Sequence, residues 1–287
     1  MLCLTLFMME PDGLKAAEPG TGVAYVPAGE FLMGTPEAGG GLSDERPQRK
    51  IFLNAFWIDL HEVTNRDYLR FIEATGHPAP AHEQAALTLW EEGRPFPGSD
   101  EHPVVNVSWN EAVAYCRWAG TRLPTEAEWE KAARGTDGRR YPWGNEWDLT
   151  LANSASFWAG RTVEFRGGQE WQAFWVKGEG ARIAEREGLN GEVLTLEVGR
   201  FPKGKSPYGL VDMAGNVSEW VADFYNPYYY LQGPLSDPPG PAPTILKTIR
   251  GGSWLKPTIS LRTSDRDFGQ PDSRLTGVGF RCARDDR

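Results

Sequence analysis

The chain has few of the residues that build metal clusters and disulfide frameworks. Its 287 residues include 3 cysteines (Cys3, Cys116 and Cys282) and 4 histidines. Such scattered cysteines are too few for a disulfide framework or a zinc cluster, and the histidines lack the spacing of motifs such as H-E-x-x-H. We therefore expect Cys116 and Cys282 to be small, buried and unpaired side chains.

Long apolar runs and clusters of basic residues are also missing. Apolar residues do not continue over the roughly 18 positions that a membrane-spanning helix requires, so no membrane span is predicted. Lys and Arg number 30 against 39 Asp and Glu, which gives a net charge of -9. Because binding to a phosphate backbone needs clustered positive charge, a nucleic acid is not an expected partner.

Glycine, proline and tryptophan, in contrast, are abundant. The chain has 33 Gly, 22 Pro and 12 Trp, while its hydrophobic and charged fractions of 40% and 24% are close to a globular average. Many turns combined with wide aromatic rings indicate a folded, loop-rich protein rather than a helical bundle. Since no internal repeat or linker is evident, one domain over residues 23–287 is predicted.

Residues 1–22 are predicted to be an N-terminal extension or a vestigial export signal. Residues 2–9 read LCLTLFMM, which has the length of a secretory signal core, and two alanines follow at 16–17. No basic residue precedes this stretch, as it does in an ordinary signal. The compartment therefore stays open: the protein is either cytoplasmic or exported through residues 1–17.

Strands and helices are predicted where the hydrophobic pattern and the capping residues agree. Residues 23–34 read as a strand, a Pro-Ala-Gly turn and a second strand, and residues 51–58 as a further strand. A helix is expected over residues 65–74. Two more helices begin at capping boxes, one starting with Ser108 and one with Thr125.

The rest of the chain is predicted to consist of loops and short strand-and-turn units. Residues 77–103 and 227–243 are expected to be loops, and the Gly-rich, charged residues 159–192 a long insertion or surface loop. The remaining strands are expected within residues 208–220, 246–254 and 278–283.

A series of motifs in a fixed order carries a family resemblance. The motifs read VPAGEFLMG, EVTNRDYLRFI, HPVVNVSWNEAVAYCRWAGTRLPTEAEWEKAARG, YPWGN, YGLVDMAGNVSEWVAD, RGGSW and GFRCAR. They extend over about residues 23–285 and resemble the formylglycine-generating-enzyme family, also called the sulfatase-modifying-factor family. The resemblance implies an α+β fold, a variant of the C-type lectin fold with little regular secondary structure.

The copper site of that family tests which activity to expect. The resemblance implies that a generating enzyme oxidises a substrate cysteine with O2, using copper(I) held by two thiolates that follow the RGGS motif. At those two positions this chain carries Lys256 and Leu261. Neither side chain is a soft ligand, so copper is not an expected cofactor and no catalytic residue is assigned.

Two functions from different classes follow from the resemblance. The first is a bacterial, monomeric member of the family without formylglycine-generating activity, acting as a lectin-like binding or accessory module. The second is an oxidoreductase of the same family, of the siderophore-maturation or formylglycine-generating type. Whether the protein is an enzyme stays open, because function depends on the site and not on the fold.

A ligand site is predicted in the segment that follows Gly251-Gly252, where the family carries its pocket. The segment mixes hydroxyl, amide and charged groups, which suit the recognition of a polar ligand or a protein partner. The candidate ligand-binding residues are Ser253, Trp254, Lys256, Ser260, Arg262 and Gln270. An ordinary exposed loop is the alternative interpretation.

Structural calcium is the predicted cofactor. Asp212 and Glu219, with the carbonyl groups of Gly215 and Val217 between them, offer the oxygen ligands that Ca2+ prefers. Gly215 allows the chain to bend around an ion. The resemblance implies a second site, for which the candidates are Asn153, Ser154, Asn190 and Glu192.

Several charged and aromatic motif residues are predicted to have structural roles. Buried charges must be paired, so these residues are expected to form ion pairs and aromatic packing that stabilise a loop-rich fold. They are Arg122, Glu126, Glu128, Trp129, Trp220 and Arg281.

Overall fold

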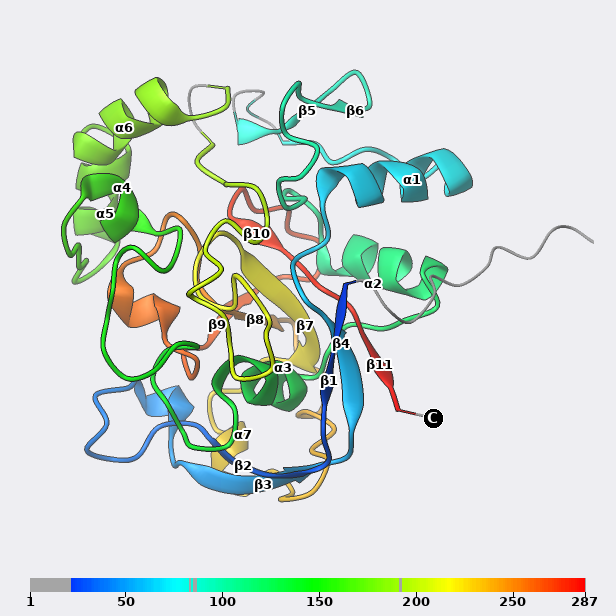
Figure 1. The fold of residues 1–287 in the computed structure, drawn as a ribbon, viewed down its shortest axis with the longest axis vertical. Helices are drawn as coiled ribbons and strands as arrows, with labels where there is room; N and C mark the ends of the chain where they lie inside the picture. Colours follow the sequence, from blue (N-terminus) through cyan, green and yellow to red (C-terminus); the bar gives the residue numbers. More distant parts are fainter. Residues whose placement is uncertain (1–21, 83, 85–86, 191–192, 287) are drawn as a thin grey trace, which may run out of the picture.

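The computed structural model describes residues 22–82, 84, 87–190 and 193–286. It is a mixed α+β structure, as predicted, with short elements joined by long irregular segments (Figure 1). Nearly all of the proposed N-terminal extension lies outside the described residues. Within the described residues, no helix has both the length and the apolar character needed to cross a bilayer.

The two ends of the domain meet in one small antiparallel sheet. Strand β4 (Phe56–Asp59) lies between β1 (Val23–Val26) and β11 (Ala283–Asp285). Figure 1 shows this arrangement, with β1 in blue and β11 in red on the two sides of β4. The inward residues Val26 and Ile58 are fully buried, so the sheet closes one side of the core.

The strand predicted over residues 51–58 is two strands. Strand β3 (Arg49–Leu53) pairs with β2 (Gly29–Met33), and the chain then turns into β4. Asn54 holds this turn, because its backbone N–H and its side-chain Nδ2 donate to the two carboxylate oxygens of Asp237, at 2.7 and 2.8 Å. A distant loop therefore breaks a run that is continuous in the sequence.

A second sheet carries the candidate site. Among the described residues its order is β10-β7-β8-β9, in which β7 (Ser218–Phe224) and β8 (Lys247–Arg250) are central. Strand β9 (Asp267–Gly269) pairs with β8, and β10 (Val278–Gly279) pairs in parallel with β7. The predicted last strand over 278–283 was therefore wrong in extent, because the chain changes sheets between β10 and β11.

The three helices with capping signals were predicted correctly. They are α1 (Asn65–Thr75), α2 (Trp109–Trp118) and α3 (Glu126–Arg134). The side chains of Ser108 and Thr125 each accept a hydrogen bond from the backbone N–H of the third helical residue. That residue is a glutamate, and its carboxylate accepts a hydrogen bond from the backbone N–H of the capping residue. The first backbone N–H groups of a helix have no acceptor within the helix, and reciprocal capping supplies one. The first residues of these helices could therefore be predicted from the sequence.

The expected loops contain only short elements among their described residues. In residues 77–103 these are β5 (Trp90–Glu91) and β6 (Arg94–Pro95), and in residues 227–243 there is α7 (Tyr229–Gln232). Two further short helices, η1 (Ser43–Glu45) and η3 (Thr258–Leu261), lie outside the expected loops.

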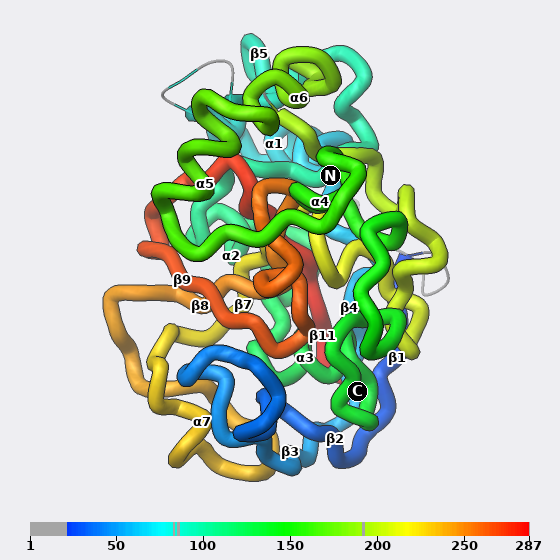
Figure 2. The backbone as a smooth tube through the Cα atoms, turned by 90° about the vertical axis from the view of Figure 1, so that its left-hand side faces the viewer, coloured from blue at the N-terminus to red at the C-terminus, as the bar shows by residue number. Residues whose placement is uncertain are grey.

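The insertion predicted as a loop over residues 159–192 is helical in its described part. Helices α4 (Ala155–Ala159), α5 (Gly168–Trp175) and α6 (Glu179–Glu187) pack together at one end of the molecule (Figures 1 and 2). Apolar side chains on α5 and α6 form a small hydrophobic cluster with Trp254. This tertiary contact, not the Gly-rich and charged composition, determines the local structure.

Cys116 and Cys282 form a disulfide, so the expectation of unpaired cysteines was wrong. Their Cα atoms are 5.7 Å apart, and the bond links α2 to the residue before β11 across 166 positions of sequence. Both side chains belong to one hydrophobic cluster. The fold brings together two buried cysteines that lie far apart in the sequence, where no local pattern indicates that they pair.

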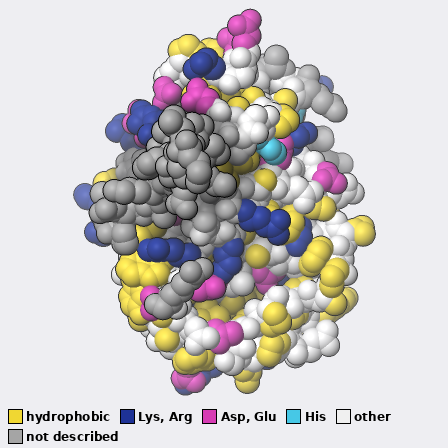
Figure 3. Space-filling view, turned by 90° about the vertical axis from the view of Figure 1, so that its right-hand side faces the viewer, with side chains coloured by type: hydrophobic (Ala, Val, Ile, Leu, Met, Phe, Trp, Pro, Cys, Tyr) yellow, Lys and Arg dark blue, Asp and Glu magenta, His cyan; other side chains and the backbone are white. Residues whose placement is uncertain are grey.

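One face of the molecule shows mixed charge rather than a basic patch. On the described part of the face in Figure 3, Lys and Arg side chains lie among Asp, Glu and hydrophobic side chains. This distribution agrees with the net charge of -9.

Candidate functional site

The candidate site is built on the segment between β8 and β9. Gly251 and Gly252 begin it with φ angles of 92° and 67°, in the left-handed region. A Cβ at Gly252 would lie 2.4 Å from the Ser260 carbonyl oxygen, so only glycine fits. This close turn directs the following residues into η3 and back to β9.

Lys256, near the start of this segment, forms an ion pair with Asp267, the first residue of β9. Its Nζ lies 2.7 Å from Oδ2 of Asp267, and the two side chains are 35% and 40% exposed. A protonated ammonium bound to a carboxylate supplies no soft donor for copper.

Leu261, at the second position where the resemblance implies a thiolate, is fully buried. It packs with Tyr141 and Ala214 in a hydrophobic cluster bordered by two tryptophans. Since Cys116 and Cys282 are joined to each other, neither offers a thiolate elsewhere in the described chain. The two copper-ligand positions therefore hold an ion-paired cation and a core residue.

The structure gives the six predicted ligand-binding residues different environments. Ser253 and Trp254 are buried, Lys256 and Ser260 are half-buried, and Gln270 is exposed. Arg262 is buried and engaged within the fold by Glu45. The surfaces that the segment offers to solvent thus come from Lys256, Ser260 and Gln270, and ligand binding by the six stays a prediction.

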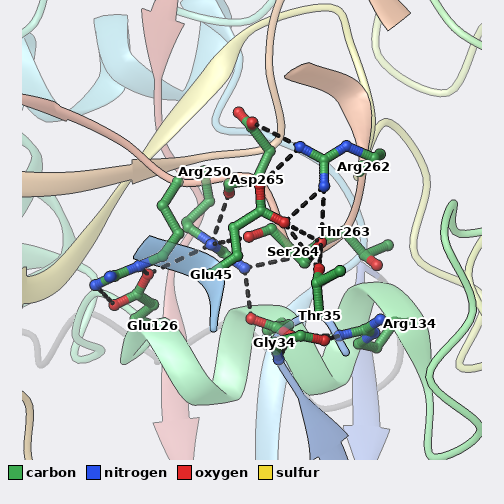
Figure 4. Close-up of polar contacts among 12 residues, drawn as sticks. Gly34, Thr35, Glu45, Glu126, Arg134, Arg250, Arg262, Thr263, Ser264 and Asp265 are labelled. Atoms are coloured by element: carbon green, nitrogen blue, oxygen red, sulfur yellow. Dashed lines mark hydrogen bonds and ion pairs between the residues drawn. The ribbon is translucent and has the colours of Figure 1, made fainter. Parts of the chain in front are cut away.

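A buried ion-pair network lies behind the segment (Figure 4). Arg262 donates to both carboxylate oxygens of Glu45 at 2.6 and 2.7 Å. Burial alone raises the pKa of Glu45, but the hydrogen bonds and charge of Arg262 outweigh it and lower the pKa to about 2. Asp265 lies 3.3 Å from Arg262, but the charge of Arg262 does not offset burial there, and burial raises the pKa of Asp265 to about 7.

Arg250 and Glu130 form the centre of the same network. Glu130 accepts from Arg250 at 2.7 Å, from Arg134 at 2.6 Å, and from the Gly34 N–H at 2.7 Å. Arg250 also lies 3.4 Å from Glu126, which Arg266 binds through two further hydrogen bonds. These side chains connect α3, β8 and the segment before β9 through charge rather than apolar contact.

The predicted structural ion pairs are confirmed. Arg122 binds Glu128 through two hydrogen bonds of 2.7 Å. Arg281 binds both oxygens of Glu219 at 2.8 Å, and the Trp129 indole N–H also donates to Glu219 at 2.8 Å.

The first set of calcium candidates lies beside this Arg281 pair. Oδ2 of Asp212 accepts the Gly199 N–H at 2.6 Å, while Glu219 is held by Arg281. Among the described residues, no group of three or more His, Cys, Asp or Glu side chains is arranged to hold a metal ion. The carboxylate of Asp212 and the backbone between Gly215 and Val217 remain a possible set of hard oxygen donors.

Glu62 is an unusual neighbour of that set. It is fully buried, and neither of its carboxylate oxygens has a hydrogen-bond partner among the described residues. Its flanking backbone joins the same region, since Leu60 accepts the Val211 N–H and Val63 donates to Phe280. Burial, followed by the charge of Asp212, raises the pKa of Glu62 well above its usual value. An unpaired buried carboxyl is costly unless it is neutral or neutralised by a cation.

The second set of calcium candidates is only partly described. Asn153 accepts the Trp158 indole N–H at 2.6 Å and donates to the Asn216 side chain at 3.0 Å. Ser154 caps α4, and Asn190 donates to the Thr88 carbonyl at 2.7 Å. Glu192 lies outside the described residues, so this set stays a prediction.

One surface depression lies away from the predicted residues. It has a volume of about 530 Å3 and is lined by Trp57, Gly120, Thr121, Arg122, Arg284, Asp285 and Asp286. Two of its polar groups are bound within the depression: Arg122 pairs with Asp285, and the Trp57 indole N–H donates to Asp286 at 3.0 Å. It therefore adds no better ligand site.

Sequence reasoning missed several residues around the site. Glu45, Glu130 and Arg250 complete the buried network, and Trp171 and Trp175 of α5 contact the segment from the other side. Arg250 had a signal, because it opens the RGGSW motif. The other four lie in segments that gave no sign of their distant partners.

Comparisons with known proteins agree with this architecture. Residues 11–286 match the family model of the sulfatase-modifying factor enzyme 1-like domain. The chain is 34% identical to a formylglycine-generating enzyme of Streptomyces coelicolor, over 96% of this chain and 95% of the relative. It is 32% identical to the inactive C-alpha-formylglycine-generating enzyme 2 of Mus musculus, over 91% of this chain and 85% of the relative.

A solved structure extends the comparison to the fold. The structure of PvdO from Pseudomonas aeruginosa is 27% identical and superposes with a TM-score of 0.70, over 92% of this chain and 94% of the other. This confirms the α+β fold expected from the motifs, the formylglycine-generating-enzyme variant of the C-type lectin fold. The chain therefore belongs to the sulfatase-modifying factor family.

Proposed function

We propose that this protein is a binding or accessory module of its family and does not generate formylglycine through a copper dithiolate. The observation that carries the proposal is the pair of residues at the thiolate positions. Lys256 is bound to Asp267 at 2.7 Å, and Leu261 is part of the core. Neither side chain can bind copper in this arrangement, because the Lys256 ammonium is held by a carboxylate and Leu261 has no donor atom.

The Lys256–Asp267 pair supports recognition of a polar ligand. The two side chains are partly exposed and hold opposite charges in a fixed relation. Such a pair offers an ammonium donor and a carboxylate acceptor side by side, which suits a hydroxyl-rich or zwitterionic group. Ser260 adds a hydroxyl group on the same segment, and Gln270 adds an amide group directly after β9. The ligand or protein partner itself is not identified by these groups.

Overall similarity does not decide between activity and its loss. The identity to an active relative, 34%, is almost the same as the identity to an inactive one, 32%. The decision rests on the site, since one scaffold hosts several functions.

A peptide assay tests the proposal. The purified protein is incubated with a sulfatase-type Cys-x-Pro-x-Arg peptide, O2 and copper(I), with the Streptomyces coelicolor enzyme as a positive control. No aldehyde is expected from this protein. Aldehyde formed at a rate comparable to the control would show an unrecognised thiolate site and end the proposal.

The alternative is an oxidoreductase of the same family that works without the cysteine pair. The similarity to a formylglycine-generating enzyme over almost the whole chain supports it. Elemental analysis of the purified protein separates the two functions. A stoichiometric transition metal or a bound redox cofactor favours the oxidoreductase, whereas calcium alone favours the binding module.

We also propose structural calcium at Asp212. The carboxylate of Asp212 and the carbonyls of Gly215 and Val217 would hold the ion, and the unpaired buried Glu62 supports the need for a nearby cation. Glu219 contributes less than first predicted, because Arg281 occupies both of its oxygens. Ca2+ would act here only by stabilising the fold.

Thermal melting with and without a chelator tests the calcium proposal. An ion present at a hundredfold excess over its Kd stabilises the folded state by about 2.7 kcal/mol. Chelation is therefore expected to lower the Tm of the wild type and to leave Asp212→Asn unaffected. Identical melting curves of the wild type in both conditions would contradict the proposal.

The disulfide supports an oxidising compartment. Disulfides persist in exported proteins and are rare in a reducing cytosol. We infer that the export alternative for residues 1–17 is the better of the two. Cell fractionation tests it, and recovery of the protein with reduced Cys116 and Cys282 from the cytosol would exclude it.

A further inference from the structure

Helices α5 and α6 form a unit that is set apart from the two main sheets. The most extensive contacts that they make with other elements are with each other and with α4. Their buried residues Trp175, Ile183 and Ala184 belong to a separate hydrophobic cluster whose members outside the insertion include Trp254. Figures 1 and 2 both show the unit at one end of the molecule, next to the segment after β8.

Two indole groups attach this unit to the candidate site. The Nε1 atoms of Trp171 and Trp175 both donate to the carbonyl oxygen of Leu255, at 3.2 and 2.9 Å. The Trp175 ring also meets the Trp254 ring edge to face, with centroids 5.2 Å apart. The attachment therefore centres on the two residues that immediately precede Lys256.

The indole N–H of Trp254 lacks a partner in this arrangement. The side chain is 3% exposed, and its Nε1 has no hydrogen bond among the described residues. A buried donor without an acceptor is unfavourable, so the closed arrangement leaves hydrogen-bonding capacity unused. A ligand with an acceptor atom would satisfy this donor once it became accessible.

We propose that residues 161–188, which contain α5 and α6, form a hinged cover over Trp254 and Leu255 and control access to the Trp254 N–H and the Leu255 carbonyl, next to Lys256. Trp171 and Trp175 hold the cover closed. Gly160, with a φ of 64°, provides a hinge just before it. Opening exposes the Trp254 N–H and the Leu255 carbonyl beside the Lys256 ammonium. The role in access rests on the proposed function, whereas the hinged motion does not.

Hydrogen exchange tests the motion without any ligand. The double variant Trp171→Phe/Trp175→Phe keeps both rings and removes both N–H donors, and Trp57→Phe is the control because its indole bonds to Asp286 elsewhere. Amide exchange across α5, α6 and residues 254–256 is expected to rise about tenfold, while α3 and β7 keep wild-type rates. Unchanged exchange in α5 and α6 would overturn the cover.

An equal rise in α3 and β7 would also overturn it, because the unit would then be part of the cooperative core. If the double variant does not fold, the single variant Trp171→Phe removes the longer of the two bonds and is judged by the same regions.

Exchange of the Trp254 indole N–H tests access to the covered groups separately. This N–H is expected to exchange with solvent deuterium severalfold faster in the double variant than in the wild type. The Trp129 indole N–H, which is bonded to the buried Glu219, serves as the control and keeps its rate. Faster amide exchange in α5 and α6 without faster exchange of the Trp254 N–H would show a unit that moves but does not control access to Trp254, and would refute that part of the proposal.

Discussion

Two sets of ion pairs with the same chemistry have opposite roles in this molecule. Glu130 and Arg250 lie 2.7 Å apart with both side chains fully buried, and Lys256 and Asp267 lie 2.7 Å apart with both partly exposed. The buried pair has additional partners on several elements, whereas solvent screens the exposed pair. Burial, rather than distance, decides whether a pair specifies the fold or is available to a ligand.

The largest expected effect is the loss of a buried partner. Glu130→Ala leaves Arg134 and Arg250 buried without their carboxylate, so the free energy of unfolding is expected to fall by about 3–5 kcal/mol. Chemical denaturation measures it, and Glu187→Ala on the exposed α6 surface is the control. A loss below about 1 kcal/mol would mean that the buried network is not what stabilises this region.

The disulfide links α2 to the residue after Arg281, at the edge of the buried pairs. Replacing Cys116 and Cys282 together by serine is expected to cost about 2–5 kcal/mol, because the bond closes a long loop in the unfolded chain. Melting with and without reductant is the measurement. The wild type should lose stability in reductant and the double variant should not; two free thiols in the native protein would contradict the bond.

Asp265 gives the buried set of charges a pH dependence. Burial raises its pKa from 3.8 to about 7. Between about pH 4 and 7 the folded state keeps a proton that the unfolded state releases. This contribution to stability is therefore complete below about pH 4 and is lost as the pH rises through about 7.

The stability of the wild type, followed as its Tm, is expected to decline between pH 5 and pH 8. The variant Asp265→Asn is expected to reduce this decline, by an amount that corresponds to a free energy of unfolding on the order of a few kcal/mol. The decline will not disappear, because burial also raises the pKa of Asp223 to about 7. Asp100→Asn, at an exposed position, is the control and should melt in parallel with the wild type. Parallel curves for Asp265→Asn and the wild type would show that Asp265 is ionised in the folded protein.

The smallest effect is expected at the exposed pair. Lys256→Ala should change the free energy of unfolding by about 0.5 kcal/mol, as surface ion pairs usually do. Chemical denaturation measures the change, and Lys50→Ala, which removes another exposed ion pair, is the control. If Lys256→Ala unfolds the protein, Lys256 is a structural partner and the ligand-site interpretation fails.

Structural features that depend on neighbouring residues in the sequence were predictable. The starts of α2 and α3 followed from capping boxes that need only residues three positions apart. The roles of Arg122 and Arg281 as ion-pair partners followed from the rule that buried charges are paired. The ordered motifs carried the fold as a whole.

Features that need distant partners were not predictable. The insertion was read as a loop, because its helices are stabilised by contact with Trp254 and not by their own composition. The disulfide was missed, because no local pattern relates Cys116 to Cys282. Among the candidate ligand residues, Lys256 and Gln270 reach solvent, whereas Arg262 is bound by Glu45, which lies far away in the sequence. Ligand binding by these residues stays a prediction.

The sequence by itself determined the family and the capped helices, since each depends on residue identity or on local spacing. The tertiary structure alone decided which charges are buried, how the cysteines pair and what covers Trp254. Those outcomes depend on burial and on contacts between remote segments, and a chain must fold before either quantity exists.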